Sequence, residues 1–447
     1  MMIVAVFALL VLWGQPCLAT DKAPQETVRE DMLRWLERYR DATPEFKPGE
    51  RLTFDDLEKI RPFIVAGYLA EFAFPGVELE IAPAGEYAPH KAYRAATEQF
   101  SAQTGLAEDG ALEGYVAGQP FGNDRLDPAD PTSGLKAAWN FNFRWQHYGH
   151  LVGRFGTILI RDGGEHAGVR HMPDDLIRGG GGAIERVMVQ RYQRVYFSHL
   201  AMHPENQYRF PAPDAGEYEW KDYTEFTEPY ELRGQRIVVH RAADPHLPDQ
   251  AWTYVPAMRK VRRVSAEEKS DSFFGTDTTL DDFYGYSGRV LDYEWKFHGW
   301  KDVLHVMNSR HSYPHYHGPR GRVPLDRWEL RKCAAVELVP KNPHHPYSSK
   351  FIFFDAQTYR TTMAVAFNRE GKLWKIWHAQ DAWSEETKDE PGMNHGTFVS
   401  RFLGIIVIDV QSGQATLFPT FTMGYPKVDP AQVSKLFDLN KLTAGRR

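Results

Sequence analysis

Two stretches near the C-terminus decide the fold class. Residues 361–377 read TTMAVAFNREGKLWKIW, and residues 401–421 read RFLGIIVIDVQSGQATLFPTF. In each stretch, a run rich in β-branched and aromatic residues is followed by a short polar turn and then by a second run of the same kind. This pattern is typical of an antiparallel β-hairpin with a short connection. The sequence therefore predicts antiparallel sheet in this part of the chain.

Segments of the same kind recur from about Lys136 onward. They are short, rich in β-branched and aromatic residues, and bounded by Gly, Pro or Asp. They cover residues 137–145, 155–162, 186–200, 230–242, 250–264, 292–304, 333–340 and 349–358. Many antiparallel strands joined by hairpins predict a mainly β (α+β) fold, with a strongly curved antiparallel sheet or partial barrel.

The first third of the chain has a different texture. Residues 21–40 have helix-forming composition with apolar residues on one helical face, and Thr53 is placed to cap a second helix that Pro62 would divide. A further short helix is expected near residues 91–104. We find no internal repeat and no long linker. The expected organisation is a signal peptide (1–19), a helical and irregular N-terminal part of the same domain (20–135), and a curved antiparallel sheet (136–447).

Composition and charge exclude several classes of protein. The chain has 447 residues, of which 42% are hydrophobic and 25% charged, and this excludes wholesale disorder, collagen-like repeats and coiled coil. Aromatic residues make up 13%, which favours strands and large apolar surfaces. A net charge of −6 argues against nonspecific binding of nucleic acid, because that binding needs an excess of Lys and Arg.

The N-terminus has the pattern of an export signal. Residues 1–13 are apolar throughout and too few for a bilayer span, and Pro16 and the small residues Cys17 and Ala19 follow them. This order predicts a secretory signal cleaved after Ala19, although a basic n-region is missing. The residues before Cys17 do not form the pattern of a lipidation site. The mature chain would keep Cys333 alone, so an internal disulfide is excluded and this cysteine is expected to be a small buried residue.

A histidine-rich run is the strongest candidate for a metal site. Residues 305–319 read HVMNSRHSYPHYHGP and contain His305, His311, His315 and His317. Imidazole is a common metal ligand, but no acidic residue in the run completes a facial triad, and the alternative is a loop whose rings stack and hydrogen-bond. We therefore predict no metal, with His311, His315 and His317 as weak candidates.

Other catalytic patterns are missing. The glycine run at residues 178–187 lacks the Lys-Ser/Thr of a phosphate-binding loop and precedes an expected strand, and the chain has no Gly-x-Ser-x-Gly elbow. No catalytic residue and no cofactor are predicted.

The strand at residues 250–264 carries charge on both faces. Arg259 and Arg263 should lie on one face, with Lys260 and Arg262 on the other, because alternate residues of a strand point in opposite directions. One set must therefore face the interior or mouth of the curved sheet. There it would meet Asp partners such as Asp281 or Asp282 in a salt-bridge network, an anionic headgroup, or water.

Aromatic residues at alternating strand positions are candidates for the wall of a cavity. Core packing is the alternative for each of them, and the sequence does not say which face is concave. Together with Arg259, Arg262 and Arg263, the predicted ligand-binding residues are Trp252, Tyr254, Phe351, Phe353, Trp374 and Trp377.

Several motifs in order resemble the domain of unknown function 1329 family. They are LEGYVAGQPF (112–121), QAWTYVPAMRKVRRVSA (250–266), DDFYGYSGRVLDYEWKFHGWKDV (281–303), the run from VELVPKNP (336–343) to LWK (373–375), and MGYPKVDPAQVSKLF (423–437). The resemblance implies a Gram-negative secreted protein with a fold similar to the lipoprotein-localisation carriers, a curved half-barrel with helices packed in its mouth. It also implies work beside exporters of the resistance-nodulation-division type, and it transfers no catalytic residues.

These observations together predict a periplasmic carrier or accessory protein for a lipid or other hydrophobic ligand. Its expected partners are that ligand, an inner-membrane exporter and, peripherally, the outer membrane. Two alternatives stay open: a metal-dependent periplasmic enzyme that uses the loop from His305 to His317, and a structural envelope protein.

Overall fold

A large antiparallel sheet dominates the structure. The computed structural model describes residues 27–165, 172–179, 181–264, 272–384 and 396–442, so the predicted signal peptide lies outside the described residues. Within them, fifteen strands join in one sheet, in the order β1-β2-β15-β16-β17-β18-β19-β20-β5-β7-β8-β9-β10-β11, with β12 paired to β15. The sheet does not close, and the predicted mainly β, curved antiparallel fold is confirmed.

The strands of this sheet are long in its centre and short at its ends. Their bounds are β1 (Arg51–Leu52), β2 (Leu79–Ile81), β5 (Gly149–Glu165), β7 (Gly181–Tyr196), β8 (Tyr218–Glu228), β9 (Arg236–Ala242), β10 (Gln250–Val255), β11 (Lys260–Val264), β12 (Tyr293–His305), β15 (Arg327–Pro340), β16 (Tyr347–Asp355), β17 (Thr361–Asn368), β18 (Leu373–Ser384), β19 (Val399–Asp409) and β20 (Gln414–Gly424). The two hairpins predicted from residues 361–377 and 401–421 are β17–β18 and β19–β20, both antiparallel.

Five α-helices lie in the described part of the chain. They are α1 (Arg29–Arg38), α2 (Leu57–Ile60), α3 (Lys91–Phe100), α4 (Ser133–Asn142) and α5 (Pro430–Leu436). The expectation of a strand at residues 137–145 is wrong, because residues 133–142 form α4. This run is apolar on most sides and is buried against β12, so its composition does not distinguish a strand from a buried helix.

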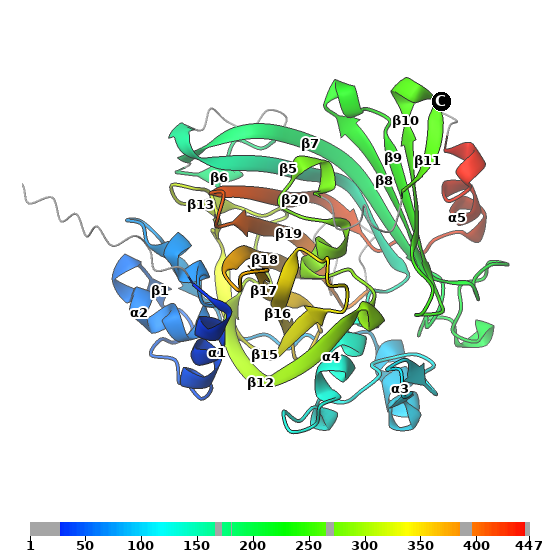
Figure 1. Ribbon diagram of the computed structural model, residues 1–447, viewed down its shortest axis with the longest axis horizontal. Helices are drawn as coiled ribbons and strands as arrows, with labels where there is room; N and C mark the ends of the chain where they lie inside the picture. The colour runs from blue at the N-terminus through cyan, green and yellow to red at the C-terminus, as the bar shows by residue number, and fades with distance from the viewer. Residues whose placement is uncertain (1–26, 166–171, 180, 265–271, 385–395, 443–447) are drawn as a thin grey trace, which may run out of the picture.

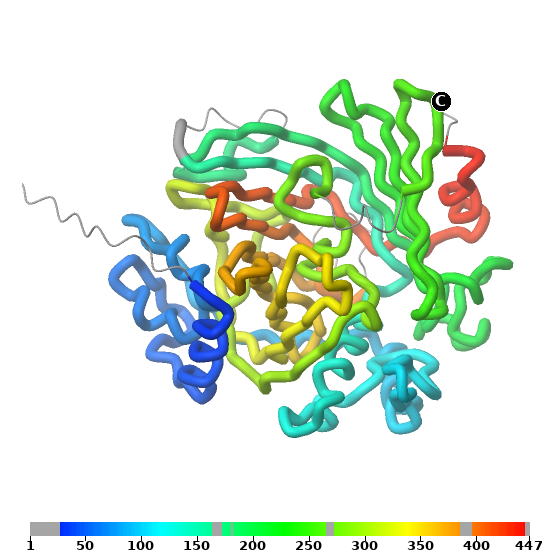
Figure 2. The backbone as a smooth tube through the Cα atoms, in the orientation of Figure 1, coloured from blue at the N-terminus to red at the C-terminus, as the bar shows by residue number. Residues whose placement is uncertain are grey.

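The sheet curves into an arch with different cover on its two faces (Figures 1 and 2). On the outer face, the N-terminal segment with α1 and α2 buries Met32, Trp35 and Phe63 against residues of β16 and β17. α5 covers the outer face of β7 to β10. On the inner face, α4 stacks Phe141 on Phe354 with ring centroids 4.7 Å apart.

Register shifts account for part of the curvature. β-Bulges interrupt the pairing of β5 with β7, of β12 with β15 between Phe297 and Trp300, and of β18 with β19 between Gln380 and Asp381. A bulge bends its strand and increases the local twist. Among the described residues, no helix is long and apolar enough to cross a membrane.

Candidate functional site

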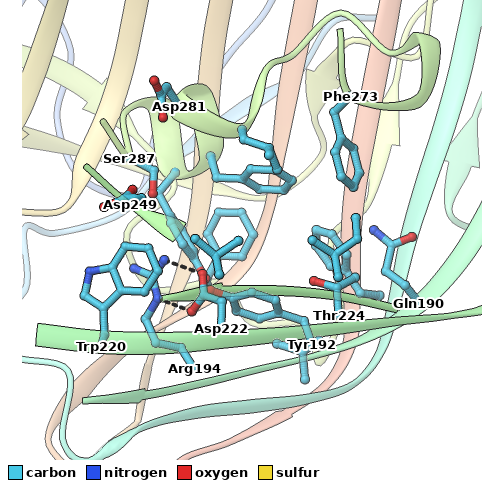
Figure 3. Close-up of a pocket in the computed structure, with 18 residues that line it drawn as sticks. Gln190, Tyr192, Arg194, Trp220, Asp222, Thr224, Asp249, Phe273, Asp281 and Ser287 are labelled. Atoms are coloured by element: carbon cyan, nitrogen blue, oxygen red, sulfur yellow. Dashed lines mark hydrogen bonds and ion pairs between the residues drawn. The ribbon is translucent and has the colours of Figure 1, made fainter. Parts of the chain in front are cut away.

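A slot opens on the inner face of the sheet, between the strands β7 to β9 and a covering segment formed by residues 272–292 (Figure 3). It contains about 830 Å³ of space between atoms, including the solvent at its mouth.

Most of the slot wall is apolar. The sheet contributes Val152 and Phe155 from β5 and Ile237 and Val239 from β9, and the covering segment contributes the residues that face them across the slot. Those facing residues are Phe273, Leu280, Phe283 and Tyr284, and Phe402 of β19 completes the wall.

Buried charge pairs frame one end of the slot. Arg194 donates two hydrogen bonds of 2.7 Å to the carboxylate of Asp222, its cross-strand neighbour (Figure 3). The guanidinium of Arg194 lies 3.9 Å from the ring centroid of Trp220, and that of Arg241 lies 4.6 Å from the same ring. Arg241 in turn pairs with Asp249 at 2.9 Å. The ring of Trp220 at this end of the slot thus contacts two cations, each of which is paired with a carboxylate.

One ion pair fastens the covering segment to the sheet. Asp282, in the short 3₁₀ element η11 (Leu280–Gly285), accepts hydrogen bonds of 2.7 Å from the Lys350 ammonium and from the Tyr347 hydroxyl. The Lys350 ammonium also lies 3.5 Å from the ring centroid of Trp377. Burial alone would raise the pKa of the Asp282 carboxyl, but attraction to Lys350 holds that pKa below its ordinary value. The carboxylate therefore stays charged.

Tyr284 lies at the centre of a second polar group. Its hydroxyl and His150 Nε2 share a hydrogen bond of 2.7 Å. Three guanidinium groups, those of Arg144, Arg194 and Arg360, lie 5.7–5.9 Å from its ring centroid. Burial and these cations hold the pKa of His150 well below its ordinary value. His150 is consequently neutral, and the positive charge here resides on arginine.

None of the nine residues predicted to bind a ligand is among the described residues that line the slot. Trp252 and Tyr254 are half-buried on the outer face with α5. Phe351 and Phe353 lie in the outer core under the N-terminal segment. Trp374 and Trp377 both contact the ring of Tyr347, in the inner core.

The basic residues in the segment 250–264 lie partly in a turn and partly in a strand. Arg259 ends the turn at φ 49°, and β11 begins after it. Arg262 is the cross-strand partner of Thr253, and Thr253 is the cross-strand partner of the slot residue Ile237. Arg263 is opposite Trp252. Cross-strand partners share a face, so Arg262 lies on the face of the slot and Arg263 on the face of α5. Asp282, considered above as an acidic partner, pairs with Lys350.

The histidine-rich run is divided among separate environments. His305 is buried beside Asp381 at 3.3 Å. His311 and His315 have ring centroids 4.1 Å apart, and His315 hydrogen-bonds to Asp175 at 3.1 Å. His317 packs edge-on against Phe74. Among the described residues, no group of three or more His, Cys, Asp or Glu side chains is placed to hold a metal ion. Cys333 is buried, and burial raises its thiol pKa well above the ordinary value.

Sequence reasoning missed the slot residues Arg194, Trp220 and Asp222. A signal for Trp220 and Asp222 exists in the stretch EWKD at residues 219–222, where three charged residues fall on both faces of β8, a strand that no segment expected from the sequence covers. This is the same pattern that singled out residues 259–263, and buried charge on a strand indicates a wet or functional face.

Comparison with known families decides the assignment. The family model described as protein of unknown function (DUF1329) matches residues 52–442. The chain belongs to the DUF1329 family. The recognition made from the sequence motifs is thereby confirmed. No curated protein matches the sequence.

Solved structures similar to this DUF1329 chain include three bacterial proteins. A putative outer membrane lipoprotein-sorting protein domain from Vibrio parahaemolyticus is 15% identical, with a TM-score of 0.45 over 70% of this chain and 100% of that one. A DUF1329 family protein from Desulfovibrio piger is 15% identical, with a TM-score of 0.46 over 70% and 99%. A LolA superfamily protein from Nitrosomonas europaea is 14% identical, with a TM-score of 0.36 over 67% and 96%. Similarities this distant assign no ligand and no residue role to the chain.

Proposed function

We propose that this protein is a periplasmic carrier that binds a lipid or another elongated hydrophobic molecule in the slot. The observation that supports the proposal is a mostly apolar, solvent-connected slot in which the buried charges of Arg194 and Asp222 are paired with each other. Removing apolar surface from water gives about 25 cal/mol per Å², so even about 200 Å² of buried ligand surface contributes about 5 kcal/mol before the costs of association.

The test is to fill the slot. Val239→Phe adds a ring to the slot wall, and we expect it to weaken binding of the uncharged fluorescent probe phenylnaphthylamine about tenfold, or about 1.4 kcal/mol. Undiminished affinity in a folded Val239→Phe protein would place the ligand elsewhere. Trp252→Ala, on the opposite face of the same strands, is the matched comparison. A loss of probe affinity in folded Trp252→Ala would instead support the wall role predicted for Trp252 from the sequence.

Arg262 is the proposed contact for an anionic group on the ligand. It is exposed and lies two strands from Ile237, or about 10 Å at the usual strand spacing. Arg262→Ala should weaken an anionic amphiphile in a salt-sensitive way and leave the uncharged probe unaffected. Arg263→Ala, one residue along the same strand, is the control because its side chain points to the other face. Equal effects of the two substitutions would contradict this role.

The tips of two neighbouring hairpins are the proposed contact with a membrane. The turns β8–β9 and β10–β11 lie at the same end of their strands, and a Cβ on Gly234 would be 3.6 Å from Pro256 (Figure 1). Tyr230 is 81% exposed and Met258 44%. Arg233, Arg259 and Lys260 stand beside them. Exposed apolar residues with neighbouring cations are suited to an anionic lipid surface, although the exposed Glu231 next to Tyr230 carries the opposite charge.

Co-sedimentation with vesicles containing phosphatidylglycerol tests this contact. Tyr230→Ser with Met258→Ser should reduce the bound fraction, whereas Leu247→Ser, which removes another exposed apolar residue from the β9–β10 connection, should not. An exporter of the resistance-nodulation-division type is the proposed protein partner, and the support for it is the family resemblance alone. Crosslinking in the native envelope, with recovery of an exporter subunit, tests it.

A further inference from the structure

A second, smaller cavity lies beside Arg144, the second residue after α4. It contains about 340 Å³ of space between atoms, including solvent at its mouth. Arg144 and Arg360 line it together with hydroxyl and aromatic groups, and none of its described lining residues is acidic. It is less than half the size of the slot, and polar and aromatic groups make up most of its lining.

Arg144 differs from the other buried arginines around it. Arg194, Arg241 and Arg360 each pair with a carboxylate, at 2.7–2.9 Å. Arg144 is 7% exposed, yet among the described residues no carboxylate lies within ion-pair distance of it. Its Nη1 donates to the carbonyl oxygen of Phe141 at 2.6 Å, and its buried Nε has no partner.

The surroundings of Arg144 make this missing counter-charge costly. Its guanidinium lies 4.0 Å from the ring centroid of Phe141, a contact that stabilises a cation far less than a carboxylate does. Burial, together with repulsion from Arg360 and Arg194, lowers the pKa of Arg144 to about 10. The group therefore remains a cation at neutral pH and is held in a destabilising position. Ser400, which lines the same cavity, also has a buried hydroxyl without a partner.

We propose that this cavity binds a small oxyanion, a carboxylate or phosphate group, which supplies the counter-charge of Arg144. The planar guanidinium presents donors in a fork that matches such an anion, and Ser400 Oγ offers a further donor. The anion comes either free from solution or as the head of an amphiphile. Tyr284 lines the slot, and its ring centroid lies 5.9 Å from the Arg144 guanidinium. An amphiphile with its head at Arg144 and its apolar chain in the slot would therefore pass beside Tyr284.

Arg144→Met is the decisive variant, because Met keeps the apolar stem and removes the unpaired charge. We expect the ligand-free variant to melt no lower than the wild type. Arg125→Met is the matched control, since Arg125 also stacks on a phenylalanine, at 4.8 Å, and donates to backbone carbonyl oxygens, but lies outside the cavity. Each protein is titrated with inorganic phosphate, decanoate, decyl phosphate and uncharged decanol, with binding measured by calorimetry and by the shift in melting temperature.

The expected result is that an anionic probe binds the wild type and Arg125→Met about equally and Arg144→Met at least about tenfold more weakly, while decanol does not distinguish the three. Binding of inorganic phosphate identifies a free oxyanion, and binding of decanoate or decyl phosphate alone identifies an amphiphile. Unchanged affinity of every anionic probe in Arg144→Met overturns the proposal, as does the absence of binding to the wild type. Decanol reports on the slot separately, so the carrier function and the anion site can fail independently.

If Arg144→Met does not fold, Ser400→Ala and Arg144→Lys give the same information. Lysine keeps the charge but loses the fork, so it should weaken anion binding without abolishing it. Anion affinity that is unaffected in both variants also overturns the proposal.

Discussion

The Asp282→Asn substitution would test how the covering segment is held over the slot. The replacement is nearly isosteric, so it removes charge and leaves the packing intact. Lys350 and Asp282 have side chains only 2% and 4% exposed, and the ammonium of Lys350 would keep an amide oxygen and the ring of Trp377 as its remaining contacts. Removing one partner of a buried pair costs about 3–5 kcal/mol. The cation–π contact with Trp377 is present before and after the substitution, so it does not offset this cost.

The Tyr347 hydroxyl loses a charged acceptor in the same variant, which adds about 1 kcal/mol. The net expectation is a loss of about 4–6 kcal/mol. With an unfolding entropy of about 2.1 cal/mol/K per residue, a chain of this length has a melting temperature that falls by roughly 4–6 °C. Hydrogen exchange should accelerate first in residues 279–286, because the lost contacts fasten that element.

Asp281→Asn is the matched control, since Asp281 is its half-buried neighbour and lines the slot. The double variant Asp282→Asn/Lys350→Met should recover most of the lost stability, because it removes the unpaired charge. A melting shift of less than about 1 °C, with unchanged exchange in residues 279–286, would refute the view that this pair fastens the covering segment.

Three further predictions concern other parts of the fold. Asp222→Asn leaves Arg194 without its counter-ion and should cost about 3–5 kcal/mol, measured by urea unfolding. Gly134→Ala should break the contact between α4 and β12, because the added Cβ would lie 2.5 Å from the backbone of Trp295, whereas Gly105→Ala meets nothing within 4 Å and should be neutral by the same measurement. Burial lowers the pKa of His199 and of His317 to about 4 in the folded protein, whereas a histidine in the unfolded chain has a pKa of about 6.5. Between pH of about 6.5 and 4, the unfolded chain therefore binds protons at these residues that the folded chain does not bind. Stability should therefore fall as pH drops from about 6.5 toward 4, by about 1 kcal/mol per histidine at pH of about 5.5, and His317→Phe should flatten the dependence of melting temperature on pH.

Most strands of the sheet were predictable because their sequence patterns are local, although no expected segment covers β8. β17 to β20 are short runs of β-branched and aromatic residues around polar turns, and no long-range information is needed to identify them. α4 was not predictable in this way, since an apolar segment of its length fits a strand and a buried helix equally well. What distinguishes the two is the close approach of Gly134 to β12, which exists only in the folded chain.

The slot could not be located from sequence for a related reason. Both faces of β16 to β18 are buried, so the alternation of Phe351 and Phe353 identifies a shared face without saying what covers it. The slot also depends on the pairing of β20 with β5, between strands about 250 residues apart in the chain. Charged residues on both faces of a strand were the usable signal, and EWKD carries it as clearly as residues 259–263 do.

The arrangement of charge on the inner face determines which ligands each cavity can accept. Around the slot, Arg194, Arg241 and Lys350 are each satisfied by a carboxylate. An anionic group of a ligand would have to displace that carboxylate. The carboxylate is favoured, because it is already ordered and desolvated in the folded protein, whereas the ligand would still have to lose entropy and hydration on binding. The slot is therefore selective for uncharged, apolar parts of a molecule. Arg144 differs from these three cations, and an anionic ligand group can bind beside it without displacing a carboxylate. Charge pairing thus separates the two cavities by chemistry.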